Sequence, residues 1–177
     1  MLVCHVLRYS KYYSKIKEII DSGVIGEVVS LDHTENIGYF HFAHSYVRGN
    51  WRDSNTTTPM IMAKTCHDLD LIHWFMDGGC ISVSAFGSLN HFRKEKAPEG
   101  AADRCLNGCK VKDSCPYDAE RLYITAPLRK ATFLRFMGRT ITGKQNATQD
   151  DKYKALKEGD YGRCVYHSDN NVCDNYT

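Results

Sequence analysis

Two segments of alternating apolar and polar residues, 27–35 and 80–89, each follow a stretch with helical periodicity. The first stretch, residues 10–22, carries Ile16, Ile19 and Ile20 on one stripe, as in a helix that buries one face. The second stretch, residues 59–76, ends at Asp77-Gly78-Gly79 and is also expected to be a helix. Alternation predicts strands with one buried face. The order of the elements therefore predicts an α+β domain with a mainly antiparallel sheet.

Composition limits the class of protein. A chain of 177 residues suits one domain, and 42% hydrophobic with 25% charged residues is ordinary for a globular protein. The net charge of +2 gives no reason to expect nucleic acid or an anionic membrane as a partner. No run approaches the roughly 20 apolar residues of a membrane span, and the amino terminus lacks the features of a signal peptide. A cytoplasmic protein is expected.

Eight cysteines are many for this length, and free thiols or a metal site are more common than disulfides in the cytoplasm. Cys105, Cys109 and Cys115 have C-x3-C-x5-C spacing and are predicted to bind zinc or an iron-sulfur cluster. A disulfide from Cys105 or Cys109 to Cys115, or plain free thiols, are the alternatives. Candidates for a fourth ligand are Cys66, Cys80, Cys164 and a histidine.

Three segments carry a family resemblance. Residues 6–27, the Trp51-Arg52-Asp53 element and the helix with His67, Asp70 and Trp74 resemble the glucose-fructose oxidoreductase, inositol dehydrogenase and MocA (Gfo/Idh/MocA) family. The resemblance is good to about residue 92, and the cysteine loop is similar to one in a branch of the family. It implies a C-terminal domain with an open antiparallel sheet and helices on one face. Residues 1–8 would be a remnant of the last Rossmann strand, and 9–177 the C-terminal domain, truncated at its end.

Members of this family bind NAD(P) through a separate Rossmann domain, with a glycine-rich turn and a Glu-Lys-Pro lysine. This sequence contains neither G-x-G-x-x-G nor Glu-Lys-Pro, and Glu95-Lys96-Ala97-Pro98 is interpreted as coincidence. The Rossmann domain is therefore expected to be absent. We expect the chain alone to bind no NAD(P) and to be inactive.

The resemblance implies that His67 is the catalytic acid/base, because imidazole has a suitable pKa for accepting a hydroxyl proton. The family often has an aspartate four residues earlier, where this chain has Ala63. Lys64 or Asp68 could substitute electrostatically, and Lys64 is included among the substrate-binding residues. Asp70 could orient His67 or could have a structural role, such as capping a neighbouring strand.

A polar and aromatic segment precedes this helix. Sugars bind well to an aromatic ring beside forked donors, so Arg48, Asn50, Trp51 and Arg52 are predicted to bind substrate. An ordinary loop anchored by tryptophan is the alternative. His5 and Arg8 follow the expected Rossmann strand and are predicted to lie near the cofactor in a complete enzyme.

The sequence thus predicts the substrate-binding domain of an NAD(P)-dependent oxidoreductase that acts on a hydroxyl of a sugar, amino sugar or cyclitol. An oligomerisation or metal-binding module without dehydrogenase activity is the alternative. A homo-oligomer, such as a dimer formed through the sheet face, is the expected partner.

Overall fold

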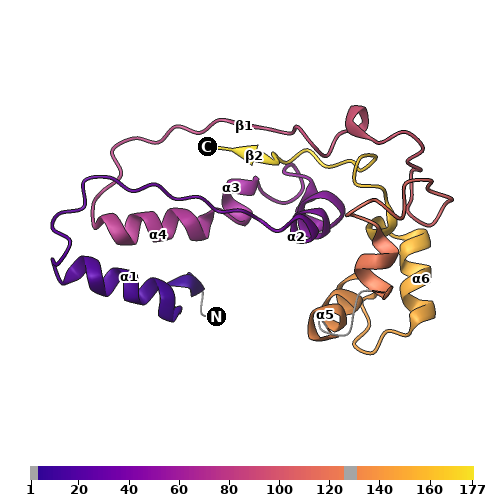
Figure 1. Cartoon of the computed structure of the whole chain (residues 1–177), viewed down its shortest axis with the longest axis horizontal. Helices are drawn as coiled ribbons and strands as arrows, with labels where there is room; N and C mark the ends of the chain where they lie inside the picture. Colours follow the sequence, from indigo (N-terminus) through magenta and orange to yellow (C-terminus); the bar gives the residue numbers. More distant parts are fainter. Residues whose placement is uncertain (1–3, 126–130) are drawn as a thin grey trace. The chain divides into compact units, whose positions relative to one another are not determined.

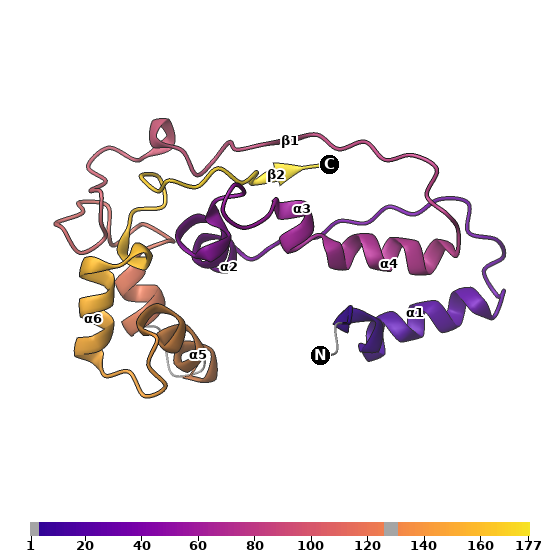
Figure 2. The same cartoon turned by 180° about the vertical axis from the view of Figure 1, so that it is seen from behind.

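The chain divides into two compact units, each built from two segments that are distant in the sequence. A computed structural model describes residues 4–125 and 131–177. Unit 1 contains residues up to 36 together with 59–85, and unit 2 contains 37–58 together with 86–177. Figures 1 and 2 show the elements from opposite sides. Across the described residues, no helix is both long enough and apolar enough to cross a bilayer.

Unit 1 is helical. Its elements are a 3-10 helix over Val6–Tyr9, α1 over Lys11–Asp21, α3 over Met60–Ala63 and α4 over Cys66–Met76. The helix predicted over 10–22 is confirmed. Gly23 has a φ of 72° and its amide donates to the carbonyl of Ile20, which is the left-handed end that glycine favours. Residues 6–8 are helical where a strand was expected, and residues 1–3 lie outside the described part of the chain.

The helix expected over 59–76 is interrupted. Lys64 has φ −128° and ψ −50°, outside the helical region, and α4 begins only at Cys66. This break places His67 in the first turn of a new helix, where backbone amides lack intrahelical partners. The interruption therefore determines the surroundings of the predicted catalytic residue.

Unit 2 contains the other helices and the only strand pair among the described residues. Its elements are α2 (Tyr39–Phe42), a π-helix (Ala43–Arg48), a 3-10 helix (Asn50–Arg52), β1 (Gly87–Ser88), a 3-10 helix (Lys94–Lys96), a π-helix (Arg121–Thr125), α5 (Ala131–Thr142), α6 (Gln149–Glu158), a 3-10 helix (Asp160–Gly162) and β2 (Asn175–Tyr176). The charged segment 151–158, which the sequence predicts to be a short helix, is confirmed as part of α6. Thr148 begins it with a capping box, in which the Thr148 side chain and Asp151 each bond the other's backbone amide.

The predicted antiparallel open sheet is wrong for the described residues. They are mostly helical and contain a single antiparallel pair, in which Gly87 of β1 lies opposite Tyr176 of β2. Segments 27–35 and 80–85 have no strand partner, and Val29 is 89% and Ile81 100% exposed. Alternation reports which side chains could share a face, but a strand also needs a neighbour at about 4.8 Å to bond its backbone. The local pattern could not supply that neighbour.

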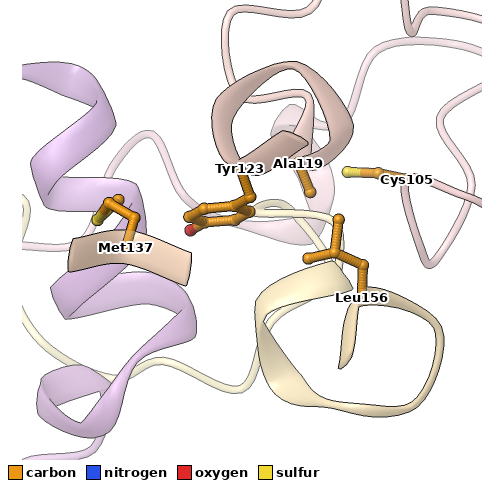
Figure 3. Close-up of a cluster of buried hydrophobic side chains, with 5 residues drawn as sticks. All are labelled: Cys105, Ala119, Tyr123, Met137 and Leu156. Carbon is orange, nitrogen blue, oxygen red and sulfur yellow. The ribbon is translucent and has the colours of Figure 1, made fainter. Parts of the chain in front are cut away.

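The core of unit 2 forms between helices of its second segment. Cys105, Ala119, Tyr123, Met137 and Leu156 are all less than 9% exposed, and Figure 3 shows their side chains converging. Burial of a leucine such as Leu156 stabilises a fold by about 1.5–3 kcal/mol. Burial also raises the pKa of Tyr123 to about 12, against the opposing charge of Arg48. The core thus holds α6 against the segment that carries the cysteine loop.

Candidate functional site

His67 lies in the first turn of α4 and has an unpaired nitrogen. Its Nδ1 is buried and makes no hydrogen bond. The imidazole ring of His5 packs edge-on against the ring of His67, with the two ring centroids 5.8 Å apart. The two predicted residues His5 and His67 are therefore neighbours in unit 1. A hydrogen bond normally decides which nitrogen of a histidine carries the proton, and at Nδ1 of His67 the described residues supply none.

Asp70 binds Arg8 and not His67. Its carboxylate accepts two hydrogen bonds from the Arg8 guanidinium, at 2.7 Å from Nε and 2.6 Å from Nη2. The hydrogen bond from Arg8 holds the pKa of Asp70 below its usual range. Arg8 also lies 5.3 Å from the centroid of the Trp74 ring. Of the two roles open to Asp70, the structure shows the structural one, because this pair fastens the 3-10 helix to α4.

Two further pairs link the extended segment to the start of α4. His33 Nε2 lies 2.9 Å from Oδ1 of Asp68, and Lys64 donates to Oε1 of Glu35 at 2.9 Å. Residues 33 and 35 share a face of an extended chain, so both side chains can point towards the break at Lys64 and the first turn of α4. Asp68 is 4% exposed, and its Oδ2 makes no hydrogen bond. Asp68 and Lys64, the two residues that could replace the aspartate missing at Ala63, therefore pair with His33 and Glu35. Neither His33 nor Glu35 was predicted to belong to the site.

These contacts create two clusters with metal-ligating groups. His5, Cys66 and His67 each offer a ligand atom, and these atoms lie within 4.8 Å of one another. His33, Glu35 and Asp68 form a second set with the same limit. Nitrogen and sulfur ligands suit zinc, whereas a histidine with two carboxylates suits several divalent ions. In the sequence, only the adjacent positions of Cys66 and His67 indicate the cluster with His5.

The predicted substrate segment, residues 48–52, lies in unit 2 and separates into buried and exposed parts. Arg48 is 1% exposed, and it donates from Nε to the carbonyl of Arg163 at 2.7 Å and from Nη2 to that of Tyr117 at 2.9 Å. Asn50 is exposed and Trp51 is 43% exposed. Arg48 therefore lies in the interior of unit 2, whereas Asn50 and Trp51 lie on its surface.

Arg52 joins an ion-pair network. Its guanidinium lies 2.8 Å from Asp169 and 3.2 Å from Asp160, and Arg163 lies 2.8 Å from Asp169. Burial acts to raise the pKa of Asp169, but hydrogen bonds from Arg163 and Arg52 outweigh it and hold the pKa below its usual value. The network ties the 48–52 segment to the residues that follow α6.

The cysteine loop lines a cavity in unit 2. Cys105, Cys109 and Cys115 all border this cavity, together with Cys164 and Arg48. All eight cysteines are free thiols in the structure, which does not contain the disulfide considered as an alternative. The structure thus brings the three predicted metal ligands together and adds one of the four proposed sources of a fourth ligand.

His44, on the π-helix over Ala43–Arg48 in unit 2, should make the stability of the fold depend on pH. Burial lowers its pKa to about 4, with help from His41 and Arg48, while its Nδ1 lies 3.0 Å from the Tyr123 hydroxyl. The unfolded chain protonates His44 near its ordinary pKa of 6.5, so stability is complete above 6.5 and falls as the pH drops towards 4. We expect a loss of up to about 3 kcal/mol from this group. Urea unfolding at pH 7 and 4.5 measures it.

Carboxylates titrate in the same range, so the comparison is with His44→Gln, which keeps a hydrogen-bonding group but does not titrate. The unfolding free energy of this variant should depend less on pH than that of the unmodified chain. Equal pH dependence in both proteins would contradict the assignment.

Comparison with known proteins identifies the family. The sequence profile of the oxidoreductase family's C-terminal alpha/beta domain, GFO_IDH_MocA_C, matches residues 17–172. The chain therefore belongs to the Gfo/Idh/MocA family, as predicted. The curated protein "Putative oxidoreductase YteT" of Bacillus subtilis (strain 168) is 33% identical over 114 residues. That alignment covers 62% of this chain and only 26% of YteT. No solved structure matches.

The predicted site residues are divided between the two units. His5, Arg8, Lys64 and His67 lie in unit 1. Arg48, Asn50, Trp51, Arg52 and the cysteine loop lie in unit 2. The roles assigned to these residues in catalysis and binding stay predictions.

Proposed function

We propose that this chain is the substrate-binding domain of an NAD(P)-dependent oxidoreductase acting on a hydroxyl carbon of a sugar, amino sugar or cyclitol. The family match over residues 17–172 is the observation that carries the proposal. His67 supports it, because its Nδ1 is not held by a hydrogen bond and so remains a candidate acceptor for a substrate proton. Oxidation of a carbinol releases the hydroxyl proton, which His67 would accept.

NAD(P) would accept the hydride in that reaction, and we propose that this chain does not itself bind the dinucleotide. Its sequence has no glycine-rich G-x-G-x-x-G turn, and the described residues contain no parallel strands on which such a turn is built. Arg8, predicted to lie near the cofactor, directs its guanidinium to Asp70. The role of this chain would therefore be to bind the substrate and handle its proton.

We propose Trp51 and Asn50 as the substrate contacts of unit 2. An exposed indole ring offers a flat apolar face for the C–H face of a sugar, and a neighbouring amide can both donate and accept hydrogen bonds. His67 and Lys64 belong to unit 1, and their roles towards substrate are proposed for that unit by itself.

The purified chain should bind a sugar or cyclitol without oxidising it. We expect saturation-transfer NMR signals from at least one member of a panel of hexoses, amino sugars and inositols, and no absorbance of NADH or NADPH. Trp51→Ala should weaken binding by about tenfold, which corresponds to about 1.4 kcal/mol. NADH formation by the pure chain would contradict the proposed division of roles.

Tyr9→Ala is the matched control, because Tyr9 is an aromatic residue that is 78% exposed but lies outside the proposed contact surface. It should leave binding unchanged. If no ligand in the panel binds, or if both variants lose binding equally, Trp51 is not the substrate platform.

A further inference from the structure

Four thiols from two distant segments border one cavity in unit 2. Cys105, Cys109 and Cys115 lie within eleven residues of one another, whereas Cys164 is 49 positions beyond Cys115 in the sequence. We propose that these residues, the four-cysteine cluster, bind a thiophilic metal centre through four thiolates. Zinc and iron-sulfur clusters share this ligand chemistry.

The backbone fixes the distant ligand beside the loop. The amide of Cys105 donates to the carbonyl of Gly162 at 3.0 Å, and that of Cys164 donates to Asp103 at 2.8 Å. These bonds flank an isolated antiparallel bridge between residues 104 and 163. Cys105 and Cys164 are therefore held on adjacent chains by hydrogen bonds on both sides. Cys66 and Cys80, the other cysteines considered as a fourth ligand, lie in unit 1.

Arg48 is a buried cation that borders this cavity, and Asp118, a buried carboxylate, borders it as well. The Arg48 side chain is 1% exposed and donates from Nη2 to Sγ of Cys105 at 3.4 Å. Its Nε and Nη2 also donate to the neutral carbonyls of Arg163 and Tyr117, while Nη1 makes no hydrogen bond. Among the described residues no carboxylate forms an ion pair with it.

A buried cation without an ion-pair partner is costly, by several kcal/mol in order of magnitude. Four thiolates around Zn²⁺ carry a net charge of about −2, and a four-thiolate iron-sulfur cluster is also an anion. Either centre would balance Arg48 and accept its N–H···S hydrogen bond. Arg48 would then act on the metal ligands as a positioning residue.

The sulfur spacing bears on which metal binds. No three ligand atoms of the four-cysteine cluster, all of whose members are described, lie within 4.8 Å of one another. Tetrahedral zinc with bonds of about 2.3 Å would place its sulfurs about 3.8 Å apart. The loop would have to contract around zinc, whereas a cluster of several irons requires wider spacing. The experiment below therefore measures both metals.

The test is the metal content of the 177-residue chain, purified anaerobically without chelator. We expect about one zinc per chain, or iron with an equal amount of acid-labile sulfide. The zinc arm is repeated with Co²⁺, whose absorption bands report thiolate ligands. Folded protein with less than a tenth of one equivalent of either metal, and no uptake of added Zn²⁺ or of iron with sulfide, would overturn the proposal.

Cys109→Ser is the principal variant, because Cys109 is only partly buried and lies outside the hydrophobic core. It should lower the metal content at least tenfold while the far-ultraviolet circular dichroism stays unchanged. Cys80→Ser, at an exposed free thiol in unit 1, should keep the full content. Full metal retention in Cys109→Ser, or a disulfide between two of the four cysteines in the native protein, would equally overturn the proposal.

Discussion

Replacing Gly162 with alanine should destabilise unit 2 by more than about 4 kcal/mol, which is a large part of the stability of an ordinary domain. A Cβ at this position would overlap the carbonyl oxygen of Leu156 and lie 2.6 Å from its carbonyl carbon. The obstacle is backbone at the end of α6, so no side-chain rotation can relieve it. Moving the turn would also break the bond from the Cys105 amide to Gly162. Thermal unfolding followed by circular dichroism measures the loss.

Gly138→Ala is the matched control. Its Cβ would lie 2.8 Å from Cε of Lys152, which is the far end of a flexible side chain that can move aside. Gly138 is inside α5, where alanine is favoured over glycine by about 1 kcal/mol. The control should therefore be neutral or slightly stabilising. If both variants unfold at the temperature of the unmodified chain, the packing of the 3-10 turn on α6 is not as described.

Replacing His67 with glutamine should lower kcat/KM by about 10²–10⁴-fold in an assembled enzyme, because glutamine keeps a polar group but cannot accept the substrate proton. The assay needs the chain joined to a dinucleotide-binding domain of a family member. The pH profile gives the second readout: the rise of kcat/KM with pH that an imidazole base produces should disappear in the variant.

His73→Gln is the control for this substitution, since His73 is an exposed histidine on the same helix. It should keep kcat/KM and its pH profile unchanged. An active assembly in which His67→Gln keeps its rate within about threefold would remove His67 from the reaction and leave it a structural residue of α4.

The helices were the predictable part of the fold. Residues 10–22 and 151–158 were recognised because periodicity, capping residues and the terminating Gly23 act within a few residues of one another. The break at Lys64 was missed, because the apolar stripe continues across it. The sequence predicted more strands than the structure has. Alternation in 27–35 and 80–89 is a property of neighbouring residues, whereas strand pairing depends on residues elsewhere in the chain.

The candidate site divides in the same way. Motif resemblance selected His67, and the comparison with known proteins confirmed the family from which it came. The pairing of Asp68 with His33 and of Asp70 with Arg8 could not be predicted, because each joins residues more than thirty positions apart. The burial of Arg48 could not be predicted either, because the residues around it in the sequence are largely polar.

The sequence alone determined the family, the positions of the main helices and the lack of a glycine-rich nucleotide turn, since each is written in residues close together. Only the tertiary structure decided that His5 packs against His67 and that Cys164 joins the cysteine loop. The reason is physical: buried backbone amides and carbonyls must find hydrogen-bond partners, and folding takes those partners from any part of the chain. The bridge between residues 104 and 163 is one example, because it brings Cys164 beside the three cysteines of the loop.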